Sequence, residues 1–220
     1  MDSLDAIVEK ARQRARFRVA ALRLEHPGQD EVALGRRLVA SMALRAGLAG
    51  AATGTLSLVA LPIGLPAGIA FSLLLEAELI FALLELYELE TGGAQGRLKL
   101  YALWAGAGFA DAAKNVGMRA GASAIARVLA GSLPVRIIRR LNPALVRAIL
   151  RRLGLGWLPR AAKFWPVLGA PVGFALDRAA LRTLGEATLA TLDDDARARR
   201  RRAAPVARSP RRRRIKVAAR

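Results

Sequence analysis

The side chains whose spacing could support chemistry are the carboxylates of residues 76–90. On a helix, Glu78, Glu85 and Glu88 lie on one side. Together with Asp111, their oxygens could bind a hard cation or serve a hydrolase. The alternative, which we favour, is that they form salt bridges with cations that follow later in the chain. These cations are Lys114, Arg119 and Arg127.

The rest of the sequence offers no catalytic constellation. It contains no cysteine, which excludes disulfides, thiolate metal sites and cysteine nucleophiles. Its one histidine, His26, precedes Pro27 in an expected turn. Neither a phosphate-binding G-x-x-x-x-G-K-[ST] loop nor a G-x-S-x-G nucleophile elbow occurs. We therefore predict that the chain is not an enzyme and that it uses no cofactor and no metal.

Positive charge is concentrated towards the C-terminal end. The formal net charge is +19, and residues 197–220 hold eleven arginines, one lysine and no acid. Like-charge repulsion and proline predict that residues 197–220 are a disordered tail, which would bind polyanions such as nucleic acid or anionic lipid. The tail has no aromatic residue, so it cannot stack on bases. Its candidate anion-binding residues are Arg199, Arg200, Arg201, Arg202, Arg211, Arg212, Arg213 and Arg214.

A second basic segment lies between Asp111 and Asp177, where the sequence has no acidic residue. We expect its cations to form a basic face that contacts an anionic surface. The candidate residues are Arg147, Arg151, Arg152, Arg160 and Lys163. Residues 144–153 predict a short cationic amphipathic helix, and Trp157 and Trp165 follow it as candidate membrane-interface residues. An ordinary surface helix over a core explains the same pattern.

Helices must position these residues, because alanine and leucine dominate the sequence and β-branched residues are scarce. The patterns predict an all-α bundle of about seven to nine helices. We expect this bundle to occupy residues 1–196, with the basic tail of residues 197–220 as a separate appendage.

Residues that stop or cap helices locate several helix ends. A first helix should stop at residues 26–28, His-Pro-Gly, and Asp30 should cap a second helix that ends near residue 44. A long leucine-rich helix is predicted for residues 67–90 and the last helix for residues 172–192. The acids at positions 193–195 should then separate the last helix from the tail.

Residues 46–75 form a run of 30 residues without a charged side chain. A membrane-spanning helix needs about 20 consecutive apolar residues, and Pro62, Gly64 and Pro66 interrupt this run. We predict a Gly-, Ala- and Leu-rich helical hairpin that is buried within the bundle. A re-entrant or shallow insertion into a bilayer is the alternative.

Glycines recur four residues apart, a spacing that places two of them on one face of a helix and allows another backbone to approach closely. We interpret these pairs as tight helix packing. They are Gly50/Gly54, Gly64/Gly68, Gly117/Gly121 and Gly169/Gly173.

The order of these features resembles the EcsC family. The uncharged segment, the long acidic and apolar helix, and a Pro-apolar-apolar-Gly-Ala step before the last helix follow one another over about residues 30–190. The residues that match this step are Pro166, Gly169, Ala170 and Gly173. The family usually has an asparagine where this chain has Asp177. The resemblance implies a mainly helical bacterial protein with no known catalytic residues, linked with an ABC-transporter operon and with membrane transport or secretion.

Three functions compete. The predicted one is a non-enzymatic accessory protein of a transport or secretion system, peripheral to the inner, cytoplasmic face of a bacterial plasma membrane and in contact with anionic lipid. The alternative is a nucleic-acid-associated protein whose arginine-rich tail binds without sequence specificity. A hydrolase or metal enzyme that uses the carboxylates of residues 76–90 is the third.

Overall fold

The computed structural model describes residues 2–56, 61–105, 122–131, 133–134, 136–137 and 169–203. Within these ranges the chain forms six helices and no strand, so the all-α prediction is confirmed, with fewer helices than the seven to nine expected. The helices are α1 (Asp2–Glu25), α2 (Glu31–Leu56), α3 (Leu61–Leu86), α4 (Gly93–Ala105), α6 (Ala122–Leu129) and α9 (Gly169–Ala203).

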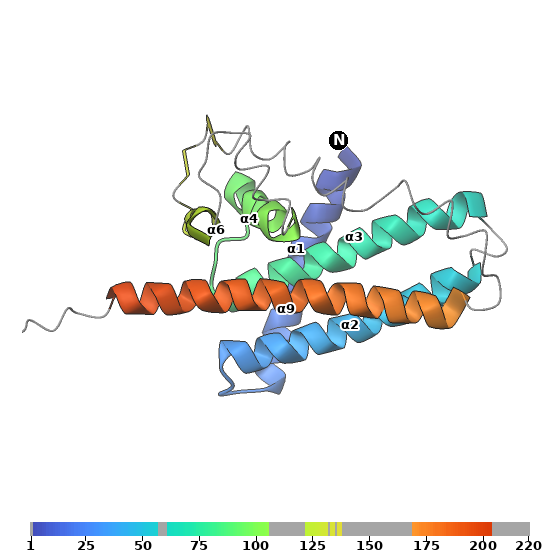
Figure 1. Cartoon of the computed structure of the whole chain (residues 1–220), viewed down its shortest axis with the longest axis horizontal. Coiled ribbons are helices and arrows are strands. Elements are labelled where there is room, and N and C mark those ends of the chain that lie inside the picture. Colours follow the sequence, from blue (N-terminus) through green and yellow to red (C-terminus); the bar gives the residue numbers. More distant parts are fainter. Residues whose placement is uncertain are drawn as a thin grey trace, which may run out of the picture.

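Three long helices, α2, α3 and α9, form the body of the bundle (Figure 1). α2 and α9 lie antiparallel, since Gly50 packs on Gly173 near one end of the pair and Glu31 meets Arg200 towards the other. α1 crosses these helices steeply and packs on α3, and it diverges from α2 after the turn that joins them (Figure 1). α4 and α6 pack on each other beside the body.

The core is built around α3, in which residues 77–84 are all fully buried. A helix that neighbours cover on every side is apolar all round instead of amphipathic, which explains the leucine-rich sequence of α3. Buried side chains converge on it from the other long helices, namely Val19 of α1, Leu38 and Met42 of α2, and Leu184 and Leu189 of α9.

The connection between α1 and α2 is the one that the sequence predicts. α1 ends at Glu25, and Gly28 takes the left-handed backbone conformation (φ 81°) that glycine adopts without strain. Asp30 caps α2, because the backbone N–H of Ala33 donates a hydrogen bond of 2.7 Å to Asp30 Oδ1. The predicted end of α2 near residue 44 is wrong, since the helix continues through the alanines and glycines that follow to Leu56.

The uncharged run of residues 46–75 corresponds to the end of α2 and the start of α3, which lie antiparallel as a hairpin (Figure 1). The residues that join them, 57–60, fall outside the described ranges. α3 starts at Leu61, earlier than predicted. Pro62 falls in its first turn, where a helix tolerates proline, and Pro66, which was expected to interrupt the run, lies inside the helix. Among the described helices none is both long enough and apolar enough to cross a membrane.

α3 stops at Leu86, before the predicted end at residue 90. The Leu89 N–H donates to the Leu84 carbonyl at 2.9 Å, and the Glu88 N–H donates to the Glu85 carbonyl at 3.1 Å. These two bonds form a Schellman motif, whose left-handed position is taken by Glu88 (φ 55°) instead of the usual glycine.

The last helix differs most from its prediction. α9 runs from Gly169 to Ala203, so the acids at positions 193–195 lie inside it, and residues 197–203 are helical where a disordered tail was predicted. The physical reason is local charge pairing at helical spacing, because Asp193 pairs with Arg197 at 2.5 Å and Asp195 pairs with Arg199 at 2.9 Å. Residues 204–220 fall outside the described ranges.

Candidate functional site

The acidic helix α3 meets arginines of α1. Glu78 is buried, and its Oε1 accepts a hydrogen bond of 2.7 Å from Arg18 Nε. Arg14 approaches the other oxygen, Oε2, at 3.9 Å. Since a buried carboxylate requires a counter-charge, this cluster joins α1 to α3 and neutralises Glu78.

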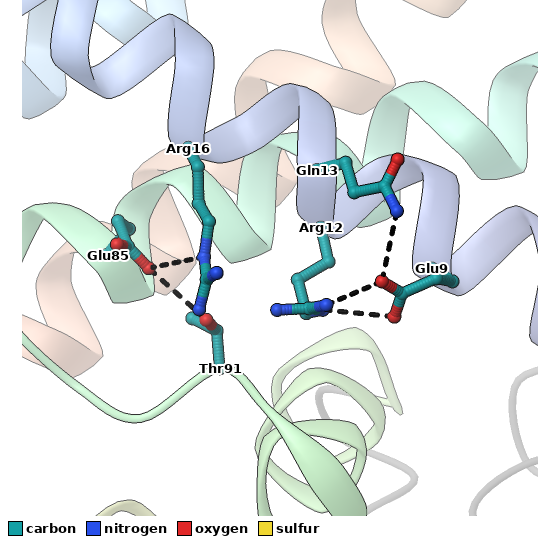
Figure 2. Close-up of polar contacts among 6 residues, drawn as sticks. All are labelled: Glu9, Arg12, Gln13, Arg16, Glu85 and Thr91. Carbon is teal, nitrogen blue, oxygen red and sulfur yellow. Dashed lines mark hydrogen bonds and ion pairs between the residues drawn. The ribbon is translucent and has the colours of Figure 1, made fainter.

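A looser contact joins the same helices further along (Figure 2). Arg16 of α1 lies 3.9 Å from Glu85 of α3, and the Thr91 hydroxyl donates to the same Glu85 oxygen at 3.2 Å. Beside it, Glu9 accepts hydrogen bonds from Arg12 and Gln13 within α1, which holds the pKa of Glu9 below its usual value (Figure 2). Polar contacts therefore line the junction of α1 with the end of α3.

The sequence predicted that these carboxylates meet arginines, and the structure identifies different partners. Glu78 and Glu85 pair with Arg14, Arg16 and Arg18 of α1. Of those later cations, Lys114 and Arg119 fall outside the described ranges. Across the described residues, no group of three or more His, Asp or Glu side chains comes together in a way that could hold a metal.

Two further acids line a small cavity of about 50 Å³ between α2, α3 and α9. Glu76 of α3 accepts a hydrogen bond from the Trp104 indole of α4. Asp177 of α9 is partly buried, and this burial raises the pKa of its carboxyl. No group within the described ranges donates a hydrogen bond to the Asp177 carboxylate, so its negative charge is disfavoured where it lies.

A much larger cleft, of about 980 Å³, lies between α1 and α2, with Glu78 of α3 among the residues that line it. The two helices diverge from their connecting turn (Figure 1), and residues of both helices line the cleft. Its lining combines arginines with apolar residues, in particular Arg14, Phe17 and Arg18 from α1, and Arg37, Leu44 and Arg45 from α2.

The cleft carries an excess of positive charge. Four arginines and two carboxylates, Glu25 and Glu78, line it, which leaves two net positive charges when His26 is neutral. Arg37 donates to the Gln29 side-chain oxygen at 3.0 Å. Within the described part of the chain, neither Arg37 nor Arg45 has a carboxylate partner. This charge favours an anionic ligand.

Large apolar side chains are exposed at the same surface. Phe17 of α1 is 79% exposed, and Leu44 and Leu48 of α2 are 46% and 58% exposed. Residues 37, 41, 44 and 48 recur at helical spacing and therefore share one side of α2. We call the cleft together with Phe17, Leu44 and Leu48 the α1–α2 surface. Exposed apolar residues among unpaired arginines are typical of an interaction site.

A second groove, of about 520 Å³, lies on the other side of α2, against α9. It holds Arg36 of α2 and Arg178 and Arg182 of α9. Arg182 pairs with Glu186 at 2.7 Å, whereas Arg178 lies over the ring of Phe174. The large exposed apolar residues Phe17, Leu44 and Leu48 do not line this groove, so it provides a comparison surface that is also basic, with three arginines and two acids in its lining.

Most of the predicted site residues fall outside the described ranges. They are Arg147, Arg151, Arg152, Trp157, Arg160, Lys163, Trp165, Pro166, Arg211, Arg212, Arg213 and Arg214. Of the remaining predicted positions, Arg199, Arg200, Arg201 and Arg202 lie in the final turns of α9. Gly169 and Ala170 begin α9, and Gly173 packs against Gly50.

Sequence reasoning missed the α1–α2 surface although a signal was present. Cations occupy every second position from Lys10 to Arg18, with Phe17 among them. On a helix that spacing places the charges on two opposite sides, so no one-sided basic face is visible. Only the ion pairs with Glu78 and Glu85 show which of these cations face inward.

Comparison with known proteins does not place the chain in a family. No protein-family model matches it, and neither a curated protein nor a solved structure matches it.

Proposed function

We propose that this chain is a non-enzymatic helical protein that binds the anionic surface of a membrane peripherally, through the α1–α2 surface. The observation that carries the proposal is the exposure of Phe17, Leu44 and Leu48 beside Arg14 and Arg45. Apolar side chains that enter the boundary between headgroups and acyl chains, with cations at headgroup level, are the usual means of interfacial binding.

The apolar residues favour lipid over nucleic acid. Arginines alone would bind either anionic lipid or nucleic acid. The exposed Arg200, Arg201 and Arg202 at the end of α9 therefore do not discriminate between the two. Exposed leucines gain free energy when a bilayer covers them, whereas a phosphodiester backbone offers them no apolar contact. The proposal places the protein at the inner face of a bacterial plasma membrane, where anionic lipids supply a negative surface potential. A role beside a transport or secretion system is part of the proposal and has its support in the resemblance to the EcsC family.

The test is flotation of the full chain with vesicles of phosphatidylglycerol and phosphatidylcholine, and with vesicles of phosphatidylcholine alone. We expect binding to the anionic vesicles that survives high salt in part, because apolar contacts are not screened. Replacing Phe17, Leu44 and Leu48 together by serine should lower the partition coefficient by about tenfold or more, since each buried side chain contributes roughly 1 kcal/mol or more.

A matched control is available on α9. Leu176 is 56% exposed, close to the 58% of Leu48, but it belongs to α9 and lies outside the α1–α2 surface. Leu176→Ser should therefore leave partition unchanged, whereas Leu48→Ser should weaken it. Absence of flotation with anionic vesicles would refute the proposal, and the nucleic-acid alternative would then be tested by retention on DNA of the full chain with and without Arg211–Arg214 replaced by glutamine.

A further inference from the structure

The residues that line the α1–α2 cleft form two groups, one near the turn that joins the helices and one further from it. Because α1 and α2 are joined at residues 26–30, Glu25 and His26 face the start of α2 near Arg37. Arg14 and Arg45 lie further from the turn, one on each helix, together with Phe17 and Leu44. Two guanidinium groups and two exposed apolar side chains thus occupy the part of the cleft that a membrane surface would meet.

Both of these guanidinium groups have N–H donors that an anion can reach. Arg45 has no ion-pair partner within the described ranges, and it is exposed. Arg14 is 47% exposed and lies 3.9 Å from Glu78, while Arg18 satisfies the nearer oxygen of Glu78 at 2.7 Å. An anion between the walls can therefore bind Arg14 and Arg45 while the pair between Arg18 and Glu78 Oε1 stays in place.

The net charge of the lining indicates which anion fits. The two excess positive charges of the cleft match a phosphomonoester, which carries close to two negative charges near neutral pH. A phosphodiester carries one negative charge and has two free oxygens, whereas a monoester has three, and a guanidinium group on each wall can bind two oxygens at once.

We propose that the α1–α2 cleft is a binding site for a lipid phosphomonoester headgroup, of the phosphatidic-acid class, held between Arg14 and Arg45 while Phe17 and Leu44 enter the bilayer boundary. This inference rests on the proposed function. A lipid is the source of the phosphate because the apolar side chains adjoin the same end of the cleft, where a soluble phosphomonoester would leave them in water.

The test compares vesicles of phosphatidic acid with vesicles of phosphatidylglycerol at matched surface potential, using the full chain. The unaltered protein should bind phosphatidic acid about tenfold more tightly, as expected for one additional charge-assisted contact. Arg45→Gln should reduce this preference to less than about twofold. Arg45→Lys, which keeps the charge and loses the two-pronged geometry, should retain phosphatidylglycerol binding and lose most of the preference.

The matched control is Arg36→Gln, which removes the same charge from the same helix but from the groove against α9. It should preserve the preference for phosphatidic acid, and circular dichroism of each variant should be unchanged because both arginines are exposed. Equal binding of the two lipids by the unaltered chain would overturn the headgroup assignment and leave the proposed function standing. No binding to either lipid would overturn both, and binding of glycerol phosphate as tight as that of phosphatidic-acid vesicles would overturn the assignment to a lipid.

Discussion

Glu78 is the carboxylate on which the contact between α1 and α3 depends. Its side chain is 1% exposed, and both of its oxygens face arginines of α1. Removing one partner of such a buried pair leaves the other charge uncompensated, which costs more than the pair contributes when intact.

We therefore expect Glu78→Gln to lower the free energy of unfolding by about 3 kcal/mol, measured by urea denaturation. The control is Glu186→Gln, which breaks the exposed Arg182–Glu186 pair on α9 and should leave the urea midpoint unchanged. If the two variants had equal stability, the Glu78 cluster would not be the anchor of α1.

For Asp177 we expect the opposite effect of a substitution, because its buried carboxylate destabilises the folded state. Burial raises its pKa above the ordinary value of 3.8, so the folded state disfavours the charged form. The penalty is absent below the unfolded-state pKa and develops as the pH rises through the folded-state value. Asp177→Asn, which introduces the residue usual in the EcsC family, should raise the free energy of unfolding at pH 7 by about 1 kcal/mol.

The pH dependence of this gain is the decisive measurement. Thermal unfolding of both proteins should give a difference at pH 7 that shrinks as the pH falls towards 3.8 and disappears well below that value, where Asp177 is protonated in the folded and unfolded states alike. A gain that persisted unchanged at low pH would show that the asparagine acts by new contacts and not by removing a charge.

At the scale of helices, the closest backbone contact joins α2 to α9. A Cβ on Gly50 would overlap the Gly173 carbonyl and would lie 2.6 Å from Asp177 Oδ2. These atoms belong to the backbone and to a packed side chain, so they cannot yield without moving a helix.

Gly50→Ala should therefore lower the free energy of unfolding by about 2–3 kcal/mol, whereas alanine ordinarily stabilises a helix interior. Gly92→Ala is the control, since a Cβ there has no atom within 4 Å and Gly92 does not have a positive φ. Its unfolding midpoint in urea should match that of the unaltered chain. A stabilising Gly50→Ala would mean that α2 and α9 are further apart than the structure places them.

Some helix ends could be predicted from sequence and others could not. The turn after α1 and the cap at Asp30 follow from backbone preferences of single residues, which act locally. The glycines past Arg45 were expected to pack tightly against another helix, but the identity of that helix, α9, could not be predicted in this way because α9 is distant in sequence. Glu88 likewise adopts a left-handed conformation that its residue type does not indicate.

For the whole molecule, composition was sufficient to predict an all-α bundle with acids that meet arginines. It was not sufficient to predict which helix supplies the arginines, because that depends on α1 crossing α3. The α1–α2 surface was missed for the same reason. Whether two helices that diverge from a turn enclose a cleft depends on the angle between them. A hydrophobicity pattern in the sequence does not predict that angle.

The final turns of α9 have a thermodynamic consequence for any polyanion that the chain binds. Arg197 and Arg199 are already paired with aspartates of α9, Arg200 lies 3.8 Å from Glu31, and all three stand at the negative end of the helix dipole. A phosphate that recruits them displaces these internal partners as well as condensed counterions. A plot of log affinity against log salt concentration should therefore be less steep than the number of arginines alone would give. The affinity of the chain for a polyanion will depend less on salt than a net charge of +19 suggests.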